Sequence, residues 1–322
     1  MKNTILLLIG ISLLLGSCDK DDNGGTVIEK EYGKKGTHEV AIFTAPDFAY
    51  SSIYYPSDLA SMEKKSPIIF FASGWFGSPE PATKYESLLT FIASHGYTVV
   101  YTDEGSTTDF HHSIDGYEQI LSLDFVKNNI QPYFDTSKIG VLGHSAGGGI
   151  AFTILDYYSK EKGYGDNGRC LMVFDPWFAF DMDESDMKAL PANTNVILLK
   201  FGIGGNNDAD GTDARIPLTE FYLLESIVSS KKDYQVFENA DHHYPTGNRD
   251  YSEMQAILKP LDGLLDYTFV EQTERIRNIA LSVGTDDPYA NGNGIQVVKP
   301  KDEYPYPCDG ANTLIDYCSI VP

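Results

Sequence analysis

A serine flanked by glycines lies between a short apolar run, residues 138–142, and a helix-compatible run, residues 146–160. The junction reads Gly143-His144-Ser145-Ala146-Gly147. A serine on a strand-to-helix turn has a strained backbone, and its hydroxyl projects from the edge of the sheet. Glycines two residues before and after it avoid clashes with the strand and the helix. Free N–H groups at the helix N-terminus can stabilise an oxyanion. The pattern therefore predicts that Ser145 is a nucleophile.

A nucleophilic serine needs a base, and the base needs an acid that orients it. Only two of the seven histidines, His242 and His243, follow Ser145 in the chain. They come just after a predicted strand at 233–237, in the order Ser, acid, His that one group of serine hydrolases uses. One of the two is therefore predicted to be the base.

The acid is expected in the loop that follows a predicted strand at 195–201. That loop contains Asp208, Asp210 and Asp213. Its segment 206–211 also resembles the start of a calcium-binding loop, although Pro217 occupies the position of the closing glutamate. Three interpretations stay open for these aspartates: a catalytic acid, calcium ligands, or an ordinary solvated loop.

The remaining pattern predicts an α/β fold with a mostly parallel central sheet and helices on both faces, because apolar strand-like runs alternate with helix-like runs. Predicted strands are 40–44, 51–55, 67–72, 97–101, 138–142, 170–174, 195–201 and 233–237, and predicted helices are 85–95, 116–129, 146–160 and 255–269. Hydrophobic residues make up 42% of the 322 residues, enough for a sizeable core.

The N-terminus is predicted to be a targeting segment. Lys2 precedes an apolar run at 4–15 that is too short to span a membrane, and small residues then precede Cys18. This resembles the lipobox of bacterial lipoproteins, with an ordinary secretory signal as the alternative. We expect a signal peptide at 1–18, a tether at 19–36, a catalytic domain at 37–275 and an irregular extension at 276–322. The protein would then be exported and anchored through a lipid on Cys18 at the outer membrane or cell surface, or released to the periplasm.

The other cysteines and the net charge give narrower expectations. Cys308 and Cys318 are predicted to form a disulfide in the extension, whereas Cys170 opens an apolar run and is predicted to be a buried strand thiol. The net charge of -22 argues against binding to nucleic acid or directly to anionic membranes.

Residues from about 54 to 243 resemble the bacterial polyester hydrolases and cutinases, near the dienelactone-hydrolase-like branch of the α/β-hydrolases. The similar segments are Gly143 to Gly149, residues 91–103 with the threonine-rich 107–109, Gly74-Trp75, Pro176-Trp177, and Asp213 with Pro217 four residues later. The sequence departs from the family at Ala146, where methionine is usual, in its acidic loop and in its long tail.

The resemblance implies an α/β-hydrolase fold and a serine carboxylic-ester hydrolase that works through an acyl-enzyme without a cofactor or metal. It favours Asp213 as the acid and His242 rather than His243 as the base. Asp208 is the runner-up for the acid, because it comes sooner after the predicted strand at 195–201. Backbone N–H groups of Trp75 and Ala146 would form the oxyanion hole. Trp75, Phe76 and Trp177 would contact the substrate.

Trp75 and Trp177 are the only tryptophans, and both follow predicted strands. They favour a bulky or aromatic ester, small or polymeric, including polyester. The alternatives are a general carboxylesterase, an esterase for carbohydrate esters or lipids, and a surface binding protein without catalytic activity.

Overall fold

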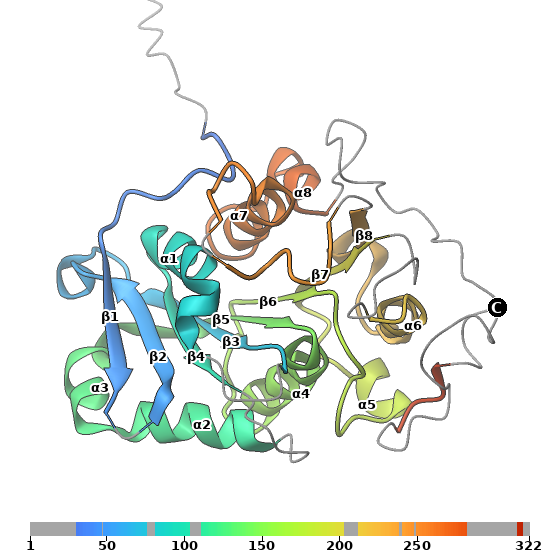
Figure 1. Cartoon of the computed structure of the whole chain (residues 1–322), viewed down its shortest axis with the longest axis horizontal. Coiled ribbons are helices and arrows are strands. Elements are labelled where there is room, and N and C mark those ends of the chain that lie inside the picture. The colour runs from blue at the N-terminus through green and yellow to red at the C-terminus, as the bar shows by residue number, and fades with distance from the viewer. Residues whose placement is uncertain are drawn as a thin grey trace, which may run out of the picture. The chain divides into compact units, whose positions relative to one another are not determined.

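The computed structural model describes residues 30–46, 48–75, 81–103, 111–202, 212–237, 240–247, 249–281 and 314–317. It is an α/β structure built on one eight-stranded sheet (Figure 1). The described residues from Tyr32 onward belong to one unit. The predicted signal peptide, Cys18, Cys308 and Cys318 lie outside the described residues, so the lipid anchor and the disulfide stay predictions.

All eight predicted strands are present, with small differences at their ends. Their order across the sheet is β1-β2-β4-β3-β5-β6-β7-β8; β2 is antiparallel to both its neighbours, and the remaining pairs are parallel. The strands are β1 (Val40–Ala45), β2 (Phe48–Pro56), β3 (Ser66–Ala72), β4 (Thr98–Thr102), β5 (Phe134–His144), β6 (Gly168–Phe174), β7 (Thr194–Phe201) and β8 (Lys232–Phe237).

The central strands are buried on both faces, as their continuous apolar runs predict. In β3, Ile68 and Phe70 join one hydrophobic cluster, whereas Ile69 and Phe71 join a second one. Successive strand side chains point to opposite faces of the sheet, so the two clusters are the two layers of the core.

Helices cover both faces. Figure 1 shows α1, α7 and α8 on one side of the sheet and α2, α4 and α5 on the other. The α-helices are α1 (Glu86–Ser94), α2 (His111–Ser122), α3 (Asp124–Asn129), α4 (Ala146–Lys160), α5 (Glu184–Lys188), α6 (Arg215–Leu223), α7 (Gln255–Phe269) and α8 (Glu274–Leu281). Short 3-10 helices are η1 (Leu59–Ser61), η2 (Ala82–Tyr85), η3 (Gln131–Tyr133) and η4 (Ser229–Lys231).

Five of these helices correct the sequence prediction. The predicted helix at 116–129 is two helices, because Leu123 has an extended backbone that interrupts the ladder and packs on the core. The sequence prediction missed α5, α6 and α8, which have five, nine and eight residues. Short helices are held by tertiary packing more than by their own propensity, so their sequence signal is weak.

Two other predictions can be compared with the structure. Cys170 is a free, buried thiol in β6, as predicted. In the tail, which the sequence predicts to be irregular, the described segment 314–317 buries Ile315 and Tyr317 in the core. Tyr317 Oη accepts a hydrogen bond from the Ala179 N–H at 2.8 Å.

Within the described part of the chain, no helix combines the length and apolar character that a membrane span requires.

Candidate active site

Ser145 lies on a strained turn between β5 and α4. Its φ of 55° is in the left-handed region, which a residue with a side chain rarely adopts. A Cβ at Gly143 would lie 2.1 Å from the Gly147 carbonyl oxygen, so glycine at 143 permits the turn to close. A Cβ at Gly147 would lie 2.2 Å from the Ser73 carbonyl oxygen, so glycine there lets α4 begin close to the end of β3. The Ser145 N–H donates to the Phe174 carbonyl at 3.0 Å, which ties the turn to the end of β6.

His242 lies in the loop after β8, with its side chain against Ser145. Its Nε2 is 3.0 Å from Ser145 Oγ, and its Nδ1 is 2.6 Å from Asp175 Oδ2. Because an ionised carboxylate only accepts, Nδ1 carries the proton and Nε2 is free to accept from the serine hydroxyl. His243 is exposed, and its ring centroid is 5.6 Å from that of His242.

Asp175, not Asp213, contacts the His242 imidazole, so the expected position of the acid is corrected. Asp213 is buried at the start of α6, but both its oxygens accept hydrogen bonds from Arg215. Its Oδ1 also accepts from the Arg215 backbone N–H at 2.9 Å. Asp208, the runner-up, lies outside the described residues, as does the calcium-like segment 206–211.

Asp175 follows β6 directly and is held from several sides. Its φ of 45° is positive, and its N–H donates to the Leu199 carbonyl at 2.7 Å. Two residues later the Trp177 N–H donates to the Ser145 carbonyl at 2.7 Å. The loop that carries the carboxylate is therefore bonded to the residue that carries the hydroxyl. Strain of this kind concentrates at functional sites.

A sequence signal for Asp175 did exist. Lys200 is the one charged residue in the apolar run 195–201, and a lysine in a buried strand needs an anionic partner. The partner is Asp175, whose Oδ1 lies 2.8 Å from Lys200 Nζ. Burial alone would raise the pKa of Asp175, but the Lys200 ammonium and then His242 hold this pKa below its ordinary value, so the carboxylate stays ionised.

A second set of hydrogen bonds joins three loops around Ser145. His144 Nε2 lies 2.7 Å from the His242 carbonyl oxygen, which can only accept, so Nε2 donates and Nδ1 accepts from Tyr85 Oη at 2.8 Å. Tyr85 Oη accepts from the Gly74 N–H at 3.0 Å. Burial, with some contribution from nearby His242, holds the pKa of His144 well below its ordinary value and keeps the ring neutral.

The residues predicted to form the oxyanion hole and to contact the substrate differ in their position and exposure around this site. Ala146 is the first residue of α4, and a Cβ at Gly74 would lie 3.1 Å from Ser145 Cβ, which places the Gly74-Trp75 loop against the nucleophile. The Trp75 side chain is 64% exposed, whereas Trp177 is half-buried and packs edge-on against Phe178. Phe76 lies outside the described residues.

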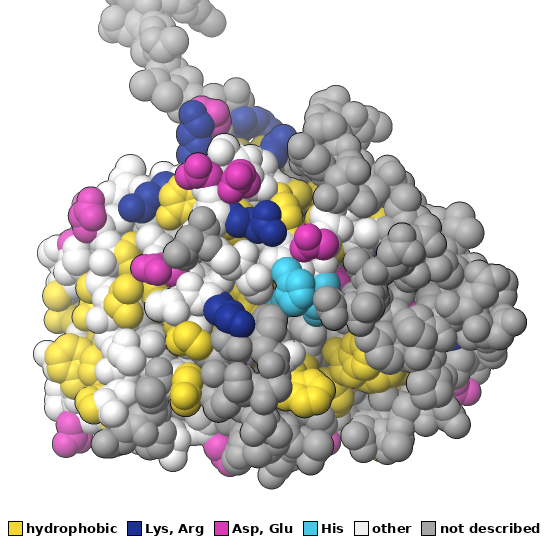
Figure 2. Space-filling model, in the orientation of Figure 1, with side chains coloured by type: hydrophobic (Ala, Val, Ile, Leu, Met, Phe, Trp, Pro, Cys, Tyr) yellow, Lys and Arg dark blue, Asp and Glu magenta, His cyan; other side chains and the backbone are white. Residues whose placement is uncertain are grey.

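The site occupies the carboxyl edge of the sheet. Its residues follow β3, β5, β6 and β8 in turn. From β3 the chain first adds β4 on one side and then β5 on the other side, so the direction in which strands are added to the sheet reverses there. Ligands bind at such a reversal in open parallel sheets. Histidine side chains reach the surface on the face shown in Figure 2, and hydrophobic side chains are exposed on the same face.

Within the described residues, no group of three or more His, Cys, Asp or Glu side chains is arranged so that it could hold a metal ion. No protein-family model matches the chain, and no curated protein matches it either.

Proposed function

We propose that this chain is an α/β-hydrolase that cleaves carboxylic esters through a serine acyl-enzyme. One observation carries the proposal: Asp175, His242 and Ser145 form a continuous hydrogen-bonded chain, with distances of 2.6 Å and 3.0 Å, and the serine lies on a strained turn at a helix N-terminus. The strand order and the antiparallel β2 are typical of the same fold family.

The proposed reaction has two halves. His242 Nε2 takes the proton of Ser145 Oγ as the oxygen attacks the ester carbonyl, while Asp175 orients and stabilises the imidazolium. The backbone N–H groups of Trp75 and Ala146 are assigned to the oxyanion. The imidazolium gives its proton to the leaving alcohol. Water then attacks the acyl-enzyme with His242 again acting as the base.

The test of the function is labelling by a fluorophosphonate together with hydrolysis of p-nitrophenyl acetate. Ser145→Ala should abolish labelling and lower ester hydrolysis by about 10⁴-fold or more, because the three residues act as a unit. His242→Ala should be similarly inactive, and His243→Ala, the matched histidine control, should retain most of the activity.

Wild-type protein that is folded but neither labelled nor active would leave a non-catalytic surface binding protein as the better explanation. Full activity of folded Ser145→Ala would remove the serine mechanism.

The proposed substrate class is a bulky or aromatic ester, including polyester. The exposed Trp75 side chain supports this, because an exposed ring beside the nucleophile can stack on a flat acyl group for about 1 kcal/mol. Trp75→Ala and Trp177→Ala should lose the preference for aromatic over short aliphatic acyl groups. Phe125→Ala on α3, also an exposed aromatic, is the control. Unchanged preference in both tryptophan variants would leave a general carboxylesterase, or an esterase for carbohydrate esters or lipids.

Export and the lipid anchor form a separate part of the proposal. In a bacterial host, Cys18 should incorporate labelled palmitate, and Cys18→Ser should not. The proposed mechanism uses no cofactor.

A further inference from the structure

Lys200 is a fully buried cation directly behind the candidate catalytic residues. It lies in β7, and its side chain is 1% exposed. Its ammonium donates to Asp175 Oδ1 at 2.8 Å and also to the Phe201 carbonyl oxygen. The side chain thus reaches the oxygen of Asp175 that His242 does not use.

The geometry fixes the orientation of the Asp175 carboxylate. Oδ1 accepts from Lys200, with the Phe201 N–H at 3.3 Å, which leaves Oδ2 for His242 at 2.6 Å. A carboxylate that is held through one oxygen cannot rotate without breaking a buried ion pair, which is strongly unfavourable. Lys200 therefore acts on the imidazole through the carboxylate and does not itself reach Ser145.

The charges show a second consequence. Asp175 is completely buried, and an unpaired carboxylate there would be strongly unfavourable. With a neutral imidazole, the set of Lys200, Asp175 and His242 has no net charge. Without the ammonium, the same set would carry one negative charge, and the imidazole would bind a proton more readily.

We propose that Lys200 is a positioning residue of this site, one that locks the Asp175 carboxylate and holds a buried positive charge behind the His242 imidazole. This inference rests on the proposed function. It extends the set of three residues to four, with the fourth supplied by a strand and not by a loop.

Other titratable groups around His242 do not replace this effect. The His144 ring lies 4.7 Å away but is neutral, and exposed His243 lies 5.6 Å away in contact with solvent. Asp241 is adjacent in the chain and also exposed, so water screens its charge. Among these neighbours, Lys200 is the buried permanent charge.

The test is the pH dependence of kcat/KM for p-nitrophenyl acetate in Lys200→Met, which has similar volume and no charge. The acid limb should move up by about one pH unit or more, and a move of one unit lowers kcat/KM about fivefold at the pH where the wild type is half active. The loss should appear in kcat more than in KM, because the ester does not contact Lys200. An acid limb at the wild-type pH in the folded variant would overturn the proposal.

Two variants control this measurement. Lys200→Arg keeps the charge, and its acid limb should stay near the wild-type position even if its size lowers kcat. Lys232→Met, in the adjacent strand β8, removes a partly buried lysine that donates to the Phe221 and Leu224 carbonyls, and it should leave the limb unmoved. A limb that moves equally in Lys232→Met would show a general loss of charge and would count against Lys200.

Thermal unfolding supplies a readout that does not depend on catalysis. If Lys200→Met fails to fold, the double variant Lys200→Met/Asp175→Asn should regain a cooperative transition, because it removes both buried charges. Failure of both to fold would assign Lys200 to packing and overturn the proposal. If the double variant regains the transition but the wild type is inactive towards esters, the buried charge pair is confirmed and only the proposed function fails.

Discussion

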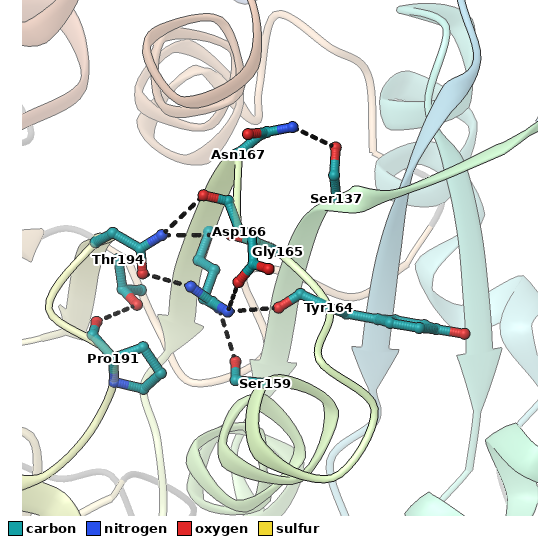
Figure 3. A network of polar contacts seen from close by, with 10 residues as sticks. Ser137, Ser159, Tyr164, Gly165, Asp166, Asn167, Pro191 and Thr194 are labelled. Carbon is teal, nitrogen blue, oxygen red and sulfur yellow. Dashed lines mark hydrogen bonds and ion pairs between the residues drawn. The ribbon is translucent and has the colours of Figure 1, made fainter.

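Lys200 and Arg169 are buried cations at opposite edges of the sheet. Lys200 lies near the carboxyl end of β7, and Arg169 lies at the amino end of β6. Arg169 donates to Ser159 Oγ at 2.9 Å, Tyr164 O at 2.6 Å, Asn193 Oδ1 at 2.5 Å and Asp166 Oδ1 at 3.2 Å (Figure 3). Three of these four acceptors are neutral, and the Asp166 side chain is 81% exposed.

The difference separates stability from chemistry. At the amino edge, Arg169 is held mainly by neutral oxygen atoms from loops and from the end of α4. None of these acceptors in turn holds a candidate catalytic residue. At the carboxyl edge, Lys200 is paired with a buried carboxylate that has a second oxygen, and this oxygen holds His242. At the amino edge, the Arg169 guanidinium joins loops through its hydrogen bonds. At the carboxyl edge, the Lys200 ammonium acts through Asp175 on His242, a side chain that can transfer a proton.

The largest expected effect tests which aspartate belongs to the carboxyl-edge site. Asp175→Asn should lower kcat/KM per folded molecule by about 10³- to 10⁴-fold, because the amide favours the wrong imidazole tautomer and cannot stabilise the imidazolium. Asp213→Asn should change kcat/KM by less than about tenfold, because Asp213 contacts Arg215 and not the base. Steady-state kinetics with active-site titration measure both.

Asp213→Asn should instead lower the thermal unfolding midpoint, since it leaves the buried Arg215 guanidinium without its carboxylate. The reverse outcome, with Asp213→Asn inactive and Asp175→Asn active, would restore the assignment that the sequence resemblance favours.

The next prediction concerns the hydrogen bonds of Arg169 at the amino edge. Arg169→Met should lower the free energy of unfolding by about 2 to 3 kcal/mol, because four acceptors lose their donor. Chemical denaturation measures this change, and kcat/KM per folded molecule should stay near the wild-type value. Arg277→Met, whose exposed guanidinium bonds to Asn278, should stay within about 0.5 kcal/mol of the wild type. A large loss of kcat/KM in folded Arg169→Met would contradict the division between the two edges.

Glu220 in α6 sharpens the comparison, because it is a fully buried carboxyl that pairs with no cation among the described residues. Burial raises its pKa well above the ordinary value. The unfolded chain loses this proton near pH 4.5 while the folded chain keeps it, so stability falls with rising pH, by at most about 1.4 kcal/mol per unit.

Glu220→Gln should therefore match the wild type near pH 4 and be more stable than the wild type at pH 7, measured by chemical denaturation. A stability difference that does not change with pH would mean that Glu220 is ionised in the folded protein and that other groups stabilise its charge.

The smallest effect concerns the hydrogen bonds that join the loops around Ser145. Tyr85→Phe removes the hydroxyl that accepts from the Gly74 N–H and donates to His144 Nδ1. A loss of about three- to tenfold in kcat is expected, with a stability loss of about 1 kcal/mol. Tyr251→Phe, at a tyrosine that packs against Phe91 in the adjacent helix α1, should keep wild-type kcat. Equal kcat in the two variants would show that these bonds do not position the site.

The nucleophile and its base depend on local rules, and the sequence alone therefore determined them as candidates. A Cβ at position 143 would clash with the backbone of residue 147, so the turn by itself requires glycine at 143, and the chain order leaves two histidines after Ser145. The eight strands were predictable for a similar reason, because strands buried on both faces must be apolar throughout.

Only the tertiary structure decided which carboxylate contacts His242. Asp213 follows β7 with a spacing that resembles a known family, but nothing in a spacing says that Arg215 occupies both its oxygens. Asp175 is 67 residues from His242 along the chain and meets it because the carboxyl ends of parallel strands converge. Contact between distant segments depends on the register and order of the strands, and electrostatic pairing then selects the carboxylate that Lys200 keeps ionised within reach of the imidazole.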